Sequence, residues 1–236
     1  MDDSLELKIA KLLRLANNNG ATEAEALNAM EKAQMLAHKH NIELAEISMS
    51  ENHTAIKINV EDFKLRIEGS GVWRRILANQ IAIHNDGDCV WIKEGGSHSG
   101  SLHIFAPEGV IPSIVKMYEF LEDWVVRTSE QEFAKARLFE GTNVHGRTWK
   151  TSWIEGAVGR LCVRIEANRD IAAAECSSET AIALIQEEVS AAKYLTYKNL
   201  GKSGTRKLRV DQDAYRAGQK AGANASLGGE KIGSGN

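Results

Sequence analysis

The chain has 236 residues, of which 43% are hydrophobic and 26% charged, proportions typical of a soluble globular protein with a sizeable core. Its formal net charge of −3 argues against a protein that binds nucleic acid over its whole surface, but it is compatible with a local basic face. The N-terminus is acidic without the apolar core of a signal peptide, no stretch is long enough to span a bilayer, and the 3 cysteines are widely spaced. We therefore expect a cytoplasmic protein with reduced thiols and no membrane partner.

The N-terminal residues predict two helices that form a hairpin. Ser4 and the acidic residues before it can cap the first helix, whose apolar face recurs at helical spacing: Leu5, Ile9, Leu12, Leu13 and Ala16. The run Asn17–Gly20 ends this helix, because Asn and Gly tolerate the left-handed conformation. Thr22 and Glu25 then have the spacing of a capping box, which indicates the start of a second helix.

The same stretch carries a composite pattern between Lys8 and Ile47. Its characteristic residues are Lys8, Leu12, Leu13, Ala16, Thr22, Glu25, Ala26, Ala33, Leu36 and Ile42. With these residues the stretch resembles the family catalogued as domain of unknown function 2786, which is found largely in phage, prophage and bacterial proteins. The resemblance implies that an α/β region follows the hairpin and that the protein belongs to a phage or prophage setting. It implies no reaction, because the family has no agreed activity.

Alternating residues predict β-structure after the hairpin. Two apolar sets differ in parity: Ile56, Ile58 and Val60, then Phe63, Leu65 and Ile67. A β-hairpin that turns at Glu61-Asp62 would place all six on one face of a sheet. Glu-Asp is a poor pair for a tight turn, so one long strand with a bulge is the alternative, and we favour the hairpin.

A helix and a second β-hairpin are expected next. The helix contains Trp73 and Ile83, and the strands Cys89–Lys93 and Ser101–Ala106 flank a glycine-rich loop. Pro107 and Pro112 mark the start of a long helix. Its later part, Ser129–Leu138, is rich in charge and is expected to project into solvent.

Another helix presents large apolar residues on one side: Trp149, Trp153, Ala157, Leu161 and Ile165. Gly156, Ala157 and Gly159 are small enough to let a second backbone approach this helix closely. The apolar run Ala181–Ile185 fits a strand or a helix equally well. A final helix, Asp211–Ala225, carries a strip of small residues: Ala214, Gly218, Gly222 and Ala225.

Together these elements predict an α+β protein. A helical hairpin domain occupies residues 1–48, and an α+β domain at residues 54–227 contains a small antiparallel sheet packed by long helices. Residues 228–236 are expected to form a disordered tail, because they are rich in glycine and polar residues.

One candidate site gathers metal-ligating residue types around the second β-hairpin: His84, Cys89, His98 and His103. Imidazole and thiolate are zinc ligands, so a zinc-dependent hydrolase or nuclease is one hypothesis. The spacing matches no familiar zinc motif. The alternative is that Cys89 is a small core residue, that His98 lies on a loop and that His103 lies on a solvated sheet face.

A second candidate site is the basic stretch that follows the predicted Glu187–Leu195 helix. Its chemistry-bearing residues are Tyr197, Lys198, Lys202, Arg206, Lys207 and Arg209. Cations, an aromatic ring and flexible glycines suit phosphate contacts and base stacking on single-stranded nucleic acid. His145, Arg147, Lys150, Arg160 and Arg164 can add to such a surface if they lie nearby. The alternative is a solvated loop whose charges are balanced by acidic helices.

Taken with the absence of familiar hydrolase, nucleotide-binding and deaminase motifs, these patterns favour a protein that binds nucleic acid or a host protein without catalysis. The metal-dependent enzyme is the alternative.

Overall fold

The computed structural model describes residues 59–67, 72–93, 100–139, 141–175, 179–198 and 210–225. Near the N-terminus it also describes single positions, namely residues 8, 11, 12, 15, 25, 28, 29, 32, 33, 35, 36 and 38–41, and all of these are helical. Ala29 and Ala33 are buried there, and Ala29 and Leu12 pack on the main hydrophobic core. The predicted helical character of this segment is thus confirmed at the described positions.

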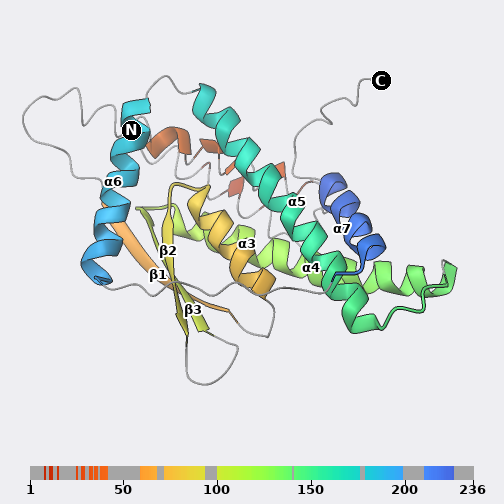
Figure 1. The fold of residues 1–236 in the computed structure, drawn as a ribbon. Coiled ribbons are helices and arrows are strands. Elements are labelled where there is room, and N and C mark those ends of the chain that lie inside the picture. The colour runs from red at the N-terminus through yellow and green to blue at the C-terminus, as the bar shows by residue number, and fades with distance from the viewer. Residues whose placement is uncertain are drawn as a thin grey trace, which may run out of the picture.

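The strands form a three-stranded antiparallel sheet, which lies between α6 and α3 in Figure 1. Its strands are β1 (Val60–Ile67), β2 (Asp88–Lys93) and β3 (Gly100–Pro107), in the order β1-β3-β2. Strands β2 and β3 form the predicted second hairpin, with Val90 opposite His103. The fold class is α+β, as predicted.

Helices cover both faces of this sheet (Figure 1). On one face lie α3 (Val72–Ile83) and α4 (Ile111–Phe139), and on the other lies α6 (Glu179–Thr196). Strand β3 is buried along its whole length, and its side chains point alternately to the two faces of the sheet. Leu102 and Ile104 join the main core, whereas Phe105 packs in a smaller cluster with α6. The run Ala181–Ile185, which fitted a strand or a helix, is therefore helical.

The turn predicted at Glu61-Asp62 is wrong. Strand β1 continues through both residues, and Asp62 lies opposite Phe105 in the ladder. Val60 and Leu65, one from each apolar set, point to opposite faces of this strand, and each face has a helix to pack against. Ile56 and Ile58 lie outside the described residues. Val60 joins the α6 cluster, whereas Leu65 is buried in the main core.

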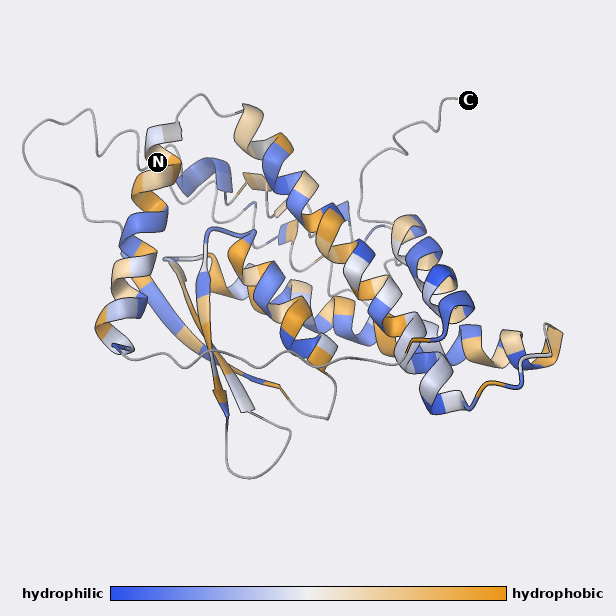
Figure 2. Cartoon of the chain, in the orientation of Figure 1, coloured by the Kyte–Doolittle hydropathy of each residue, from blue (hydrophilic) through white to orange (hydrophobic). Residues whose placement is uncertain are grey.

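The two remaining helices pack closely against each other: α5 (Gly146–Glu175) and α7 (Gln212–Asn224). Hydrophobic residues recur among hydrophilic ones along α5 (Figure 2), and the five predicted core residues of this helix are all buried. A Cβ at Gly218 would lie 1.9 Å from the carbonyl oxygen of Trp153, and a Cβ at Gly156 would lie 2.2 Å from that of Tyr215. The predicted close approach of a second backbone is confirmed at Gly156, whereas Gly159 has open space beside it.

The later part of helix α4 bears out its predicted solvent exposure on one side only. Most residues between Ser129 and Leu138 are exposed, but Ser129 and Ala136 are buried, because α5 packs along this stretch. The covered side of this part of α4 forms one wall of a cavity. None of the helices in the described part of the chain has the length and apolar character needed to cross a bilayer.

Candidate functional site

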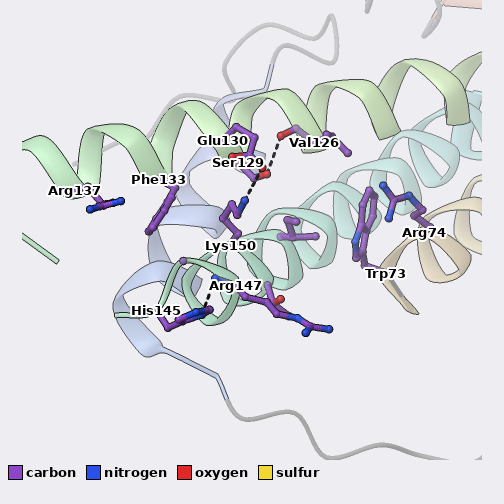
Figure 3. A pocket seen from close by; sticks show the side chains of 13 residues that line it. Trp73, Arg74, Val126, Ser129, Glu130, Phe133, Arg137, His145, Arg147 and Lys150 are labelled. Carbon is purple, nitrogen blue, oxygen red and sulfur yellow. Dashed lines mark hydrogen bonds and ion pairs between the residues drawn. The ribbon is translucent and has the colours of Figure 1, made fainter. Parts of the chain in front are cut away.

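A cavity lies where the beginnings of α3 and α5 meet the later half of α4 (Figure 3). Its volume is about 610 Å³, which is within the range of ligand-binding pockets. The side chains that line it are those of Trp73, Arg74, Val126, Ser129, Glu130, Phe133, Arg137, His145, Arg147, Lys150, Thr151 and Ile154, together with Gly146. Four of these residues are arginine or lysine, and only one is acidic.

Ion pairs neutralise some of these charges. Lys150 Nζ lies 2.6 Å from Glu130 Oε1, and Arg74 Nε lies 2.5 Å from Glu122 Oε1. Arg137 and Arg147 are exposed, and neither has an ion pair with any residue in the described ranges. These two guanidinium groups leave the cavity with an uncompensated positive charge.

The start of α5 reinforces this charge. His145 precedes the helix, and its Nδ1 accepts a hydrogen bond from the Arg147 backbone N–H at 3.3 Å. The first N–H groups of a helix carry a partial positive charge, which favours an anion. Gly146 packs so tightly here that a Cβ would lie 2.8 Å from the Phe133 ring, so α4 fixes the position of this helix end.

Two aromatic rings make cation–π contacts with cations of the cavity. The guanidinium carbon of Arg74 lies 4.4 Å from the centre of the Trp73 ring, and Lys150 Nζ lies 5.9 Å from the centre of the Phe133 ring. Trp73 is buried, and Phe133 packs against Trp149 with ring centres 5.4 Å apart. These rings are occupied by packing, so the cavity presents charge and has no free stacking platform among these residues.

The predicted basic stretch enters the described structure only at its beginning. Lys198 is exposed, whereas Lys202, Arg206, Lys207 and Arg209 lie outside the described residues. Tyr197 is half-buried and packs edge-on against Phe105 with ring centres 6.3 Å apart. Burial and the nearby Asp62 raise the pKa of Tyr197. Its ring is engaged with the sheet, which makes Tyr197 an anchor for this stretch.

The structure joins two residues that the sequence assigned to different sites. His103 Nδ1 lies 2.7 Å from Tyr197 Oη, and His103 Nε2 donates to Asp62 Oδ2 at 2.6 Å. His103 is only 4% exposed, so the solvated sheet face proposed for it is wrong: α6 and Tyr197 cover that face. No sequence motif links these three residues, which come from β1, β3 and the end of α6.

The other predicted metal ligands point elsewhere. Cys89 lies on the opposite face of the sheet from His103, where its Sγ donates to Asn79 Oδ1 at 2.9 Å. Burial raises the pKa of Cys89 to about 12, which keeps it a thiol, as expected for a small core residue. His84 Nε2 donates to Gln80 Oε1 at 3.1 Å, and burial lowers the pKa of His84.

His98 lies outside the described residues. Within the parts of the chain that the structure describes, no three or more His, Cys, Asp or Glu side chains converge so that they could hold a metal ion. The structure therefore does not bring His84, Cys89 and His103 together. Of the basic residues weighed from the sequence, His145, Arg147 and Lys150 do line the cationic cavity, together with Arg74 and Arg137. Arg160 and Arg164 do not line it, and Arg164 Nη1 instead donates to the carbonyl oxygen of Gly222 at 3.0 Å.

Comparison with known proteins adds one match. Residues 7–44 match the model of a family described as protein of unknown function (DUF2786), which confirms the resemblance seen in this segment. No curated protein and no solved structure is significantly similar to the chain.

Proposed function

We propose that the protein binds nucleic acid without catalysis, and that the cationic cavity between α3, α4 and α5 holds its phosphates. The observation that carries the proposal is the convergence of Arg74, Arg137, Arg147 and Lys150 from three helices on one cavity. In a chain with a net charge of −3, such a local concentration of positive charge favours a polyanionic ligand.

The geometry favours contacts to phosphate over contacts to bases. Arginine matches phosphate with a planar fork of donors, and both Arg137 and Arg147 have this fork available at the cavity rim. The aromatic rings of Trp73 and Phe133 are covered by cations and packing. Binding is therefore expected to be strongly dependent on salt and weakly dependent on sequence.

The basic stretch after α6 contributes further cations in this proposal. Its beginning is fixed by the hydrogen bond between Tyr197 and His103, and shortly beyond its end the Asp211 N–H donates to Ser152 Oγ on α5 at 2.8 Å. The stretch thus connects the outer face of the sheet to the first half of α5, the helix that begins at the cavity. Lys202, Arg206, Lys207 and Arg209 are the residues that would extend a phosphate track.

The test measures binding of a fluorescently labelled single-stranded 20-mer by anisotropy across a series of salt concentrations. We expect the double variant Arg137→Gln, Arg147→Gln to bind more weakly and to have a shallower salt dependence. Each lost phosphate contact lowers the slope of log K against log salt by about 0.7 for a single strand. These two residues are chosen because neutralising them leaves no described acidic partner unpaired.

The matched control is Lys220→Gln, which removes an exposed cation on α7 that has no ion pair with any described residue. Helix α7 contributes no residue to the lining of the cationic cavity. A four-residue variant, Lys202→Gln, Arg206→Gln, Lys207→Gln and Arg209→Gln, tests the basic stretch separately. Binding that is unchanged in both multiple variants, or absent at low salt, contradicts the proposal.

A host protein as the partner is the alternative, and a pull-down from lysate with and without nuclease separates the two. Partners lost on nuclease treatment support nucleic-acid binding, whereas a partner that is retained and depends on the hairpin segment supports a protein partner. The phage or prophage setting and the cytoplasmic location remain predictions from the sequence.

A further inference from the structure

Two large apolar side chains are exposed where helix α4 ends. Leu138 is 76% exposed and Phe139 is 83% exposed, more than any other large hydrophobic residue in the described ranges. Phe139 packs in neither hydrophobic cluster, whereas Phe133 of the same helix packs against Trp149. Hydrophobic stabilisation is proportional to the apolar area removed from water, so the Phe139 ring contributes little to the fold. Its chemistry is available for a contact with another molecule.

Backbone hydrogen bonds define the end of α4, so the exposure of these side chains is a feature of the fold. The Thr142 N–H donates to the carbonyl oxygen of Ala136 at 3.3 Å, and Gly141 adopts the left-handed conformation with φ of 63°. A left-handed glycine followed by an N–H that reaches back to the last turn is a common way to end a helix. The Val144 N–H then donates to Thr142 Oγ1 at 3.3 Å.

This apolar tip, formed by Leu138 and Phe139, borders the cationic cavity. Arg137, the residue before it, lines the cavity, and so does His145 at the other end of the connection from α4 to α5. Figure 3 shows Arg137 and Arg74 at opposite ends of the labelled side chains. Each helical residue turns about 100° around the axis, so Phe139 is two such steps from Arg137 and faces away from the cavity interior, beyond its Arg137 end.

An uncovered aromatic ring beside cations suits single-stranded nucleic acid. The bases of a single strand stack on aromatic side chains while its phosphates bind cations, whereas the base faces of a duplex are covered by the neighbouring base pairs. We propose that the cationic cavity and the apolar tip together select single-stranded over double-stranded nucleic acid, with phosphates at Arg137 and Arg147 and a base on the Phe139 ring. This inference rests on the proposed function, to which it adds the class of nucleic acid.

A membrane surface is the other partner that combines negative charge with apolar groups, and it fits this region less well. The headgroups of a bilayer lie in a plane, whereas the cations here line the walls of a cavity of about 610 Å³. A strand can place its phosphates in such a cavity and its bases outside it. Two apolar side chains are also fewer than the continuous apolar face of a helix that lies in a membrane interface.

The test compares a labelled single-stranded 20-mer with the duplex of the same sequence by fluorescence anisotropy, using the full chain. We expect the single strand to bind more tightly than the duplex. Phe139→Leu, which keeps an apolar side chain but removes the ring, should weaken single-strand binding by about fivefold or more and leave duplex binding unchanged. The slope of log K against log salt should stay the same in this variant, because stacking on an uncharged ring releases no counterions.

Phe139→Trp is the matched control, since it keeps an aromatic ring and should retain the preference for the single strand. Both variants change an exposed side chain, and circular dichroism checks that they are folded.

Two results overturn this inference while leaving the phosphate site in place: equal affinity for single strand and duplex, or native affinity for the single strand in Phe139→Leu. Absence of binding to both probes at low salt overturns the proposed function, and this inference with it. Vesicles of phosphatidylcholine and phosphatidylserine in equal amounts are the third probe. If they bind the native protein and displace the single strand, and Phe139→Leu binds them equally well, the tip contacts a membrane and the inference is overturned.

Discussion

The contact between α5 and α7 gives the sharpest test of the fold, because two glycines of α5 differ only in what lies beside them. Gly218 on α7 and Gly156 on α5 each face the backbone of the opposite helix, whereas Gly159 is exposed with nothing within 4 Å of an added Cβ. We expect Gly218→Ala and Gly156→Ala to destabilise the protein and Gly159→Ala to stabilise it. All three changes add the same methyl group within a helix.

The magnitudes follow from the distances. A Cβ at Gly218 starts 1.9 Å from the Trp153 carbonyl oxygen and reaches ordinary contact only at 3.4 Å, so the helices must separate by about 1.5 Å. Overpacking of this kind costs about 1–3 kcal/mol and sometimes more, and a contact with rigid backbone belongs at the upper end. The better helix propensity of alanine returns about 1 kcal/mol, which leaves a net loss of about 2 kcal/mol.

At Gly159 only the propensity term acts, so we expect a gain of about 0.5–1 kcal/mol. The assay is urea unfolding followed by circular dichroism, with the free energy of unfolding extrapolated to water. The two substitutions should therefore differ by about 3 kcal/mol. If Gly218→Ala proves as stable as Gly159→Ala, the close packing of α5 on α7 is refuted.

Three further predictions concern individual side chains. Tyr197→Phe removes the hydroxyl beside His103 Nδ1 and should lower the free energy of unfolding by about 1 kcal/mol in urea titrations; no loss would show that this hydrogen bond is not formed. Burial raises the pKa of the thiols of Cys89 and Cys162 to about 12 and about 11, from an ordinary value of 9.0. Burial favours the protonated thiol in the folded state, so the contribution of the two thiols to stability is fully present below pH 9 and is lost as the pH rises through their folded-state pKa values. Both thiols should react slowly with iodoacetamide at pH 8 unless urea is added, and mass spectrometry measures this reaction. Trp153→Ala should cost about 3–5 kcal/mol, since the Trp153 side chain is fully buried, and a loss below 1 kcal/mol would place it outside the core.

Local patterns were sufficient to predict the elements that pack through one face. The small residues of α7 recur at helical spacing, and Ala214, Gly218 and Gly222 are all buried against α5. Asp211 was predicted to begin this helix, and its carboxylate does accept the Ala214 N–H at 2.9 Å. In these cases the residue type and its spacing decide the structure without knowledge of distant neighbours.

Two of the errors share one cause, which is helix α6. The run Ala181–Ile185 did not distinguish a strand from a helix, so the second face of the sheet had no predicted cover. Without that cover, the parity change at Glu61-Asp62 favoured a turn, and His103 was left to solvent. Once α6 is present, one straight strand can bury apolar residues on both faces, and His103 is enclosed between the sheet and Tyr197.

The cationic cavity was beyond prediction for a different reason. Arg74, Arg137 and Arg147 belong to three helices, and each one alone is typical of a solvated helix face. Their convergence depends on how α4 and α5 pack, which is set by contacts such as Phe133 against Trp149 and Gly146. Sequence spacing gives no measure of such a distance.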